Sequence, residues 1–140
     1  MCCKKFIYSF FLKNCTKENT AKFKINGIYI AKIVDVYDGD TCQIVIFYNF
    51  SFKRYSLRIK NIDAPEIKSN DKTTKEKAIH VRDTVRSLIL NKILYVNIEN
   101  FDKYGRLLGD IILDNNDHLS TYLLELELVK PYDGGKKPQW

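Results

Sequence analysis

Three successive runs of β-branched and aromatic residues between positions 27 and 62 constrain the fold of this chain more than any other feature. The first run, 27–37, is followed by the turn sequence Asp38-Gly39-Asp40, and the second run, 41–48, by a turn at 49–51. The third run, 53–62, alternates apolar and polar side chains, as a strand with one buried face does. Turns this short join antiparallel neighbours, so the sequence predicts a three-stranded antiparallel meander.

Between the third and fourth strands the sequence predicts a helix. Ala64-Pro65 ends the third strand, and residues 67–77, which are polar and rich in lysine, are expected to form a mobile loop. Apolar residues then recur at helical spacing, which predicts a helix over 75–91. Its buried face is expected to consist of Ala78, Val81, Val85, Leu88 and Ile89.

Two further strands, 93–98 and 107–113, and a short second helix complete the expected fold. Asp117 is placed to cap this helix, which is expected to run through Glu127. The tail, 130–140, contains proline and glycine and is expected to be irregular. Five short strands with a helix between the third and the fourth predict a β-rich α+β protein, a five-stranded OB-fold β-barrel with two or three helices. The expected buried stripe of the second helix is Leu119, Leu123 and Leu126.

The composition agrees with one folded domain and an anionic partner. The 140 residues are 45% hydrophobic, which excludes low-complexity disorder for most of the chain. With 23 basic and 17 acidic residues the net charge is +6, which favours nucleic acid, phosphate or a membrane surface without choosing among them. The four cysteines lack the paired spacing of a zinc site and are too few for a disulfide scaffold, so Cys42 is expected to be a small core residue.

Residues 1–24 are expected to be a leader, and residues 25–140 the folded domain. The apolar run 6–12 follows two lysines but is too short to span a bilayer, and no small-residue cleavage site follows it. The leader is therefore a flexible segment, an imperfect signal, or a membrane anchor acylated at Cys2 and Cys3. The cysteine usage favours an intracellular protein, with a membrane-anchored or secreted one as alternatives.

Acidic residues gather at the strand ends, together with two arginines. Asp38 and Asp40 occupy the first turn, Asp63 and Glu66 follow the third strand, and the arginines are Arg58 and Arg106. Each residue alone is ordinary for a solvated turn. As a set, they contain carboxylates that can hold a hard cation, arginines that match phosphate oxygens, and a further carboxylate that can accept a proton from water.

At these positions the chain resembles the staphylococcal nuclease (thermonuclease) family. The matching segments are Asp38-Gly39-Asp40-Thr41, Arg58 with Ile62-Asp63-Ala64-Pro65-Glu66, and Asp102-Lys103-Tyr104-Gly105-Arg106. Arg58 stands five residues before Asp63, and Glu66 three after it, as in the family pattern. The three motifs occur in the family's order, and the resemblance covers residues 28–132.

The resemblance implies a metal site. Asp40 and Asp63 are implied to be carboxylate ligands, and Ala64, where the family often has threonine, to coordinate through its main-chain carbonyl. Asp38 and Thr41 are implied to support the ligands from beside them. The implied cofactor is one Ca²⁺ ion, although carboxylate ligands leave other divalent ions open.

The resemblance also implies catalytic and substrate-binding roles. Glu66 matches the general base, while Arg58 and Arg106 match the arginines that bind the phosphate under attack. Lys103 and Tyr104 match residues near the terminal phosphate of a bound nucleotide.

The implied activity is that of a calcium-dependent nuclease that cleaves DNA and RNA and leaves 3′-phosphorylated products. Single strands are expected to be preferred, since aromatic rings can stack on unpaired bases. We expect a monomer without an obligate protein partner. The alternative is a non-catalytic OB-fold module that binds nucleic acid or protein.

Two positions depart from the family pattern. Glu127 stands where relatives commonly carry glycine, and Tyr132 lies near the family's base-stacking tyrosines, which leaves open which aromatic residue contacts the base. Lys136 and Lys137 in the tail are expected to take no part in catalysis.

Overall fold

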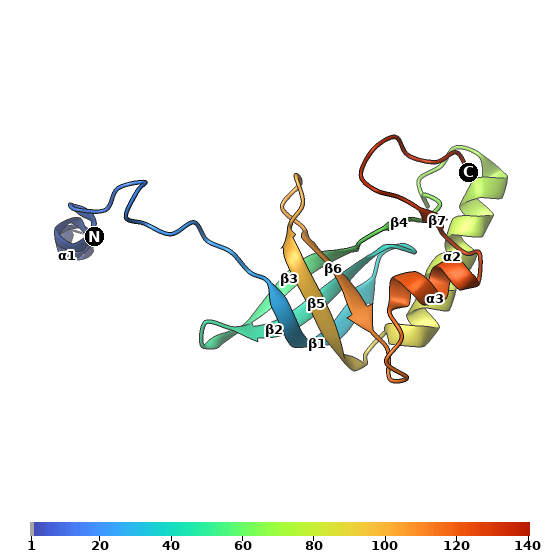
Figure 1. Cartoon of the computed structure of the whole chain (residues 1–140), viewed down its shortest axis with the longest axis horizontal. Coiled ribbons are helices and arrows are strands. Elements are labelled where there is room, and N and C mark those ends of the chain that lie inside the picture. Colours follow the sequence, from blue (N-terminus) through green and yellow to red (C-terminus); the bar gives the residue numbers. More distant parts are fainter. Residues whose placement is uncertain (1) are drawn as a thin grey trace.

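The computed structural model describes residues 2–140, and for residues 2–6 it describes the backbone alone. Five strands form a closed barrel in the order β1-β2-β3-β6-β5, as Figure 1 shows. All neighbours are antiparallel except β3 and β6, which are parallel. This arrangement confirms the predicted OB-fold barrel and its meander. The strands are β1 (Gly27–Val36), β2 (Thr41–Tyr48), β3 (Ser51–Ile59), β5 (Ile93–Phe101) and β6 (Leu107–Ile112).

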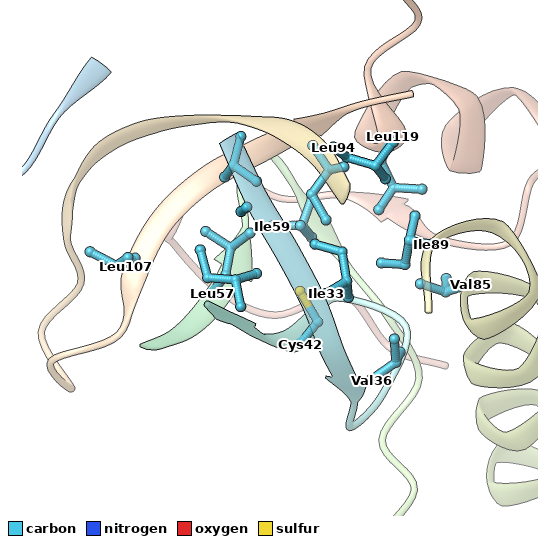
Figure 2. Close-up of a cluster of buried hydrophobic side chains, with 14 of the residues drawn as sticks. Ile33, Val36, Cys42, Leu57, Ile59, Val85, Ile89, Leu94, Leu107 and Leu119 are labelled. Atoms are coloured by element: carbon cyan, nitrogen blue, oxygen red, sulfur yellow. The ribbon is translucent and has the colours of Figure 1, made fainter. Parts of the chain in front are cut away.

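The core of the barrel follows from the alternation of side chains along its strands. In β2, the residues Cys42, Ile44 and Ile46 are buried, while the residues between them are partly exposed. Burial raises the pKa of the Cys42 thiol to about 12, so Cys42 is a neutral core residue as predicted. Figure 2 shows its sulfur among aliphatic side chains from the barrel and from Val85 and Ile89 of α2 (Lys72–Ile89), the helix that packs against the barrel.

The third strand ends earlier than the sequence suggested. It was expected over 53–62, but β3 stops at Ile59, and Asn61 adopts a left-handed conformation with φ 62°. That turn directs the chain out of the barrel into β4 (Ile62–Asp63), which pairs with β7 (Lys130–Pro131). The part of the tail expected to be irregular therefore begins with a short strand beside Asp63.

Both barrel helices differ from the prediction at their ends. The stretch 67–77 was expected to be a loop, but α2 begins at Lys72, because the Asp71 carboxylate accepts a hydrogen bond from Thr74 N at 2.7 Å and caps the helix. The second helix, α3 (Leu119–Glu125), has His118 rather than Asp117 at its N-cap and ends before Leu126. Leu126 therefore lies outside the helix and is exposed, contrary to prediction.

The first helix, α1 (Cys2–Leu12), lies apart from the barrel, on the side remote from α2 and α3 (Figure 1). The connection to β1 meets the barrel at Phe23, whose ring lies 6.0 Å from that of Tyr48, and at Ile25, which is buried. No helix among the described residues combines the length and the apolar content needed to cross a bilayer. The role proposed for residues 1–24 stays a prediction, and Met1 lies outside the described residues.

Candidate active site

Segments that are distant in the sequence meet around one hollow of about 510 Å³. They are the turn between β1 and β2, the end of β3, the residues after β4, the β5–β6 loop and the tail after β7. Every residue to which the sequence assigned a role lines this hollow except Asp63, which is buried. The lining residues among them are Asp38, Asp40, Thr41, Arg58, Ala64, Glu66, Lys103, Tyr104 and Arg106, and Tyr132 and Lys137 join them from the tail.

The turn between β1 and β2 packs closely against the rest of the site. Gly39 is required there, because a Cβ at this position would lie 2.5 Å from Val81 Cγ1 and 2.7 Å from Ala64 Cβ. Asp38 Oδ1 accepts a hydrogen bond from Asp40 N at 3.1 Å, which shapes the turn. This packing places the Asp40 carboxylate beside the segment that follows β4.

Asp40 is a buried carboxylate whose two oxygens are both engaged. Oδ1 accepts from Thr41 Oγ1 at 2.9 Å, and Oδ2 accepts from Ala64 N at 2.8 Å. The pKa of Asp40 is raised to about 6, because burial and the nearby charge of Asp38 outweigh the lowering effects of Arg58 and the hydrogen bonds. Holding Asp40 ionised is therefore costly unless additional positive charge is supplied.

Arg58 lies between the two predicted carboxylate ligands. Its Nη2 is 3.2 Å from Asp40 Oδ2 and 3.7 Å from Asp63 Oδ1. Nη1 donates to Ile59 O at 2.6 Å, and Nη2 donates to Ile62 O at 2.7 Å. Two of the five guanidinium N–H donors are thus used on the carbonyls that flank the β3–β4 break, and Arg58 holds both carboxylates in place.

The tail adds two residues to which the sequence assigned no role at the site. Lys137 Nζ lies 2.6 Å from Glu66 Oε1 and 3.4 Å from Asp63 Oδ1, and Trp140 Nε1 donates to Asp63 Oδ2 at 2.9 Å. The hydrogen bond from Lys137 and its charge lower the pKa of Glu66. Lys137 therefore lies at the site, while the expectation that it takes no part in catalysis stays a prediction. No local pattern could have revealed a contact across 71 residues.

The β5–β6 loop presents a basic and aromatic surface. Asp102 Oδ1 accepts from Tyr104 N at 2.8 Å and from Arg106 N at 2.9 Å, and Asp102 Oδ2 accepts from Arg106 Nε at 2.6 Å. Gly105 has φ 81°, which favours glycine at this turn. The exposed Tyr104 ring lies 5.1 Å from Lys103 Nζ and 5.6 Å from the Arg106 guanidinium carbon. One carboxylate thus organises the loop that was predicted to bind phosphate.

The acidic part of the hollow fits a hard divalent cation. Asp63 Oδ1 is buried and accepts no hydrogen bond from the described residues, which is the state of an oxygen suited to a cation. The Lys137 ammonium already stands near it, so the position accepts positive charge. No three or more His, Cys, Asp or Glu side chains among those described are grouped for metal binding. Calcium would therefore need carbonyl and water oxygens besides Asp40 and Asp63.

Two comparisons with known proteins cover this part of the chain. A family model described as "Staphylococcal nuclease homologue" matches residues 56–132, a range that includes Arg58, Asp63, Glu66 and Arg106 and begins after Asp40. Two proteins, each named "Uncharacterized endonuclease", from Escherichia coli O157:H7 and Escherichia coli, are each 29% identical over 102 residues. The aligned region is 73% of this chain and 60% of each relative, so the chain spans less than two thirds of their length.

Proposed function

The chain belongs to the staphylococcal nuclease family, and on that basis we propose that it hydrolyses phosphodiester bonds of nucleic acid in the hollow at the end of the barrel. One observation carries the proposal. Glu66, Arg58 and Arg106 line a single hollow, and the buried carboxylates Asp40 and Asp63 lie within 3.7 Å of the same guanidinium nitrogen. A proton acceptor, phosphate-binding arginines and carboxylate ligands are thus within reach of one substrate phosphate.

In the proposed reaction Glu66 accepts a proton from the water that attacks phosphorus. The bond from phosphorus to the 5′ oxygen breaks, that oxygen takes up a proton, and the phosphate stays on the 3′ side. Arg106, held by Asp102, stabilises the charge that develops on the phosphate oxygens. Arg58 holds the carboxylates in position and adds positive charge beneath the phosphate. Calcium held by Asp40, Asp63 and the main chain at Ala64 would supply Lewis-acid stabilisation of the same oxygens.

We further propose that the substrates are DNA and RNA, with single strands preferred. The groups that face the hollow are suited to phosphate and to aromatic stacking rather than to reading base edges, which argues for little sequence preference. Tyr104, 74% exposed, and Tyr132 stand beside the arginines and offer rings to unpaired bases.

The test is cleavage of labelled single-stranded DNA, duplex DNA and RNA by the purified full chain. We expect cleavage with calcium, none with a chelator, faster cleavage of single strands than of duplex, and 3′-phosphate ends on the products. Replacing calcium by magnesium or manganese reports which ion supports the reaction. Binding of the nucleic acid without cleavage under any of these ions contradicts the proposal and favours a binding module.

A further inference from the structure

The tail that follows β7 turns back over the acidic part of the hollow. Tyr132 N donates to Asn61 O at 3.0 Å, which extends the β4–β7 pairing by one contact. In Figure 1 the tail then leaves this point as a wide loop and returns toward α2. It ends beside Asp63, where Trp140 Nε1 reaches one carboxylate oxygen and Lys137 Nζ lies near the other.

These contacts place the ammonium group of Lys137 beside Asp63, where a bound metal ion would lie. Lys137 Nζ lies within 3.4 Å of both Asp63 and Glu66. Lys130 Nζ lies 4.6 Å from the centre of the Trp140 ring, a cation–π contact that fastens the indole at the site. In the ion pair of Lys137 with Glu66 the two side chains are 55% and 61% exposed, and ion pairs of such exposure are typically weak. The contact is therefore suited to being displaced.

We propose that residues 132–140 form a strap that closes on the site through Lys137 and Trp140 and competes with the divalent cation. This inference rests on the proposed function, because it takes Asp63 as a metal ligand. A calcium ion bound to Asp63 oxygens would lie about 2.3–2.6 Å from them. A calcium ion on Asp63 Oδ1 would repel the Lys137 ammonium, which lies 3.4 Å from the same oxygen. Cation binding therefore moves Lys137 away and changes the surroundings of Trp140.

The chain supplies its own reporter, since Trp140 is its single tryptophan. We would titrate the metal-free full chain with calcium at constant ionic strength, following Trp140 fluorescence and, separately, calcium binding by calorimetry. The variants are Lys137→Met, which removes the charge, and Lys136→Met, a control at the exposed neighbouring lysine. We expect the emission to change with the calorimetric midpoint. We also expect Lys137→Met to bind calcium about two- to fivefold more tightly than wild type or Lys136→Met.

The outcomes separate the strap from the proposed function. If calcium binds all three proteins equally and Trp140 emission stays constant, the strap is wrong and the metal site stands. If Lys137→Met binds calcium more weakly, Lys137 supports the site rather than competing for it, and the strap is wrong again. If none of the three binds calcium and none cleaves nucleic acid with any divalent ion, the proposed function fails as well.

A separate feature lies at the turn between β2 and β3. Asn49 and Phe50 form a two-residue turn in which both have positive φ, 49° and 61°, as in the type I′ turn. Glycine is favoured at the second position, and a bulky residue with positive φ is an outlier. Phe50 is also 93% exposed. The phenylalanine at position 50 is therefore explained neither by the backbone conformation of the turn nor by packing against the rest of this chain.

The surroundings of Phe50 are aromatic and basic. Phe47 and Phe52 are exposed as well, with their ring centres 5.3 Å apart. Lys53 and Arg54 follow directly and are exposed. The whole segment 41–61 has four basic residues and no acidic one. An apolar tip flanked by lysine and arginine matches the acyl and headgroup layers of an anionic bilayer.

The geometry points to this hairpin tip, which comprises Phe47, Phe50, Phe52, Lys53 and Arg54, as a docking surface for an anionic lipid bilayer. The tip lies roughly 25 Å along the β2–β3 ladder from the Thr41–Arg58 pair at the hollow. Docking by the tip therefore leaves the Thr41–Arg58 end of the ladder, at the hollow, away from the lipid surface. Figure 1 shows α1 on the same side of the barrel as the tip, and α1 carries further exposed aromatic residues, among them Phe10 and Phe11.

Vesicle co-sedimentation of the full chain tests this surface. We expect binding to phosphatidylcholine vesicles that contain phosphatidylserine and weak binding to phosphatidylcholine alone. Phe50→Gly suits the turn better than phenylalanine does, so this variant keeps or gains stability. Its binding to the mixed vesicles is expected to fall about ten- to a hundredfold. Lys53→Gln is expected to lower binding about fivefold.

Three results would overturn the lipid assignment. The first is equal binding of wild type and Phe50→Gly to the mixed vesicles, and the second is binding of neither. The third is a Phe50→Gly variant that still binds the vesicles but has lost single-stranded DNA binding, or self-association measured by gel filtration. Wild type and Phe50→Gly are expected to cleave a soluble oligonucleotide at the same rate.

Discussion

Replacing Asp40 by asparagine is expected to stabilise the metal-free protein while removing its activity. The fold raises the pKa of Asp40 from 3.8 to about 6, because burial and the charge of Asp38 outweigh Arg58 and the hydrogen bonds to the carboxylate. A shift of about 2 pH units at about 1.4 kcal/mol per unit makes the ionised form cost about 3 kcal/mol at neutral pH. Asparagine has the same shape and no charge to desolvate.

The sign of the pH dependence follows from the raised pKa. Between about pH 4 and pH 6 the folded state binds more protons at Asp40 than the unfolded chain does. This residue therefore lowers the free energy of unfolding as the pH rises through that window, and its effect is constant above it. In Asp40→Asn this fall is absent, so the two proteins are expected to be equally stable near pH 4 and to differ by about 3 kcal/mol at pH 7.

Urea denaturation in chelator, at several pH values from 4 to 8, measures the difference. Asp114→Asn, at an exposed carboxylate in the turn before α3, is the control and is expected to show the wild-type pH dependence. Saturating calcium should stabilise wild type and reverse the order, because Asp40→Asn lacks a ligand. An Asp40→Asn protein that is less stable than wild type at pH 7 in chelator refutes the reasoning, as does an unchanged pH dependence.

Two further substitutions test how the site is built. Gly39→Ala places its Cβ against Val81, so we expect the free energy of unfolding, measured by urea denaturation, to fall by about 1–3 kcal/mol. Part of this stability should return in the double variant with Val81→Ala. If the effects of the two substitutions simply add, there is no clash. Asp110→Ala removes the buried carboxylate that accepts hydrogen bonds from Ser120 N and Oγ. We expect the free energy of unfolding to fall by about 1–3 kcal/mol and the kcat of the folded protein to stay the same. A drop in kcat would assign Asp110 a part in the reaction.

Residues close in sequence or fixed by strand geometry were predictable. The alternation in β2 follows from the two-residue period of strands, and the confirmed meander follows from its short turns. The turn expected at 49–51 is one residue shorter in the structure, Asn49-Phe50, and this shift of one residue is what brings Thr41 opposite Arg58. The gathering of Asp40 and Arg58 is therefore a consequence of register.

What the sequence could not predict depends on contacts made only after folding. The start of α2 depends on the Asp71 cap, which outweighed the polar composition of the expected loop. Lys137 and Trp140 reach Asp63 because β7 pairs with β4, and that two-residue pairing leaves no hydrophobic pattern of its own. The same break at Asn61 that shortened β3 creates the edge on which β7 pairs.

We propose that Glu66 accepts the proton of the attacking water and that cleavage depends on a divalent cation. The most direct measurement is the single-turnover rate of single-stranded DNA cleavage at saturating calcium by wild type, Glu66→Gln and the exposed control Glu125→Gln. We expect a fall of about 10²–10⁴-fold for Glu66→Gln, with calcium binding retained, and the wild-type rate for Glu125→Gln. Cleavage by Glu66→Gln at the wild-type rate contradicts this role of Glu66, and a wild-type rate that a chelator leaves unchanged contradicts the need for a cation.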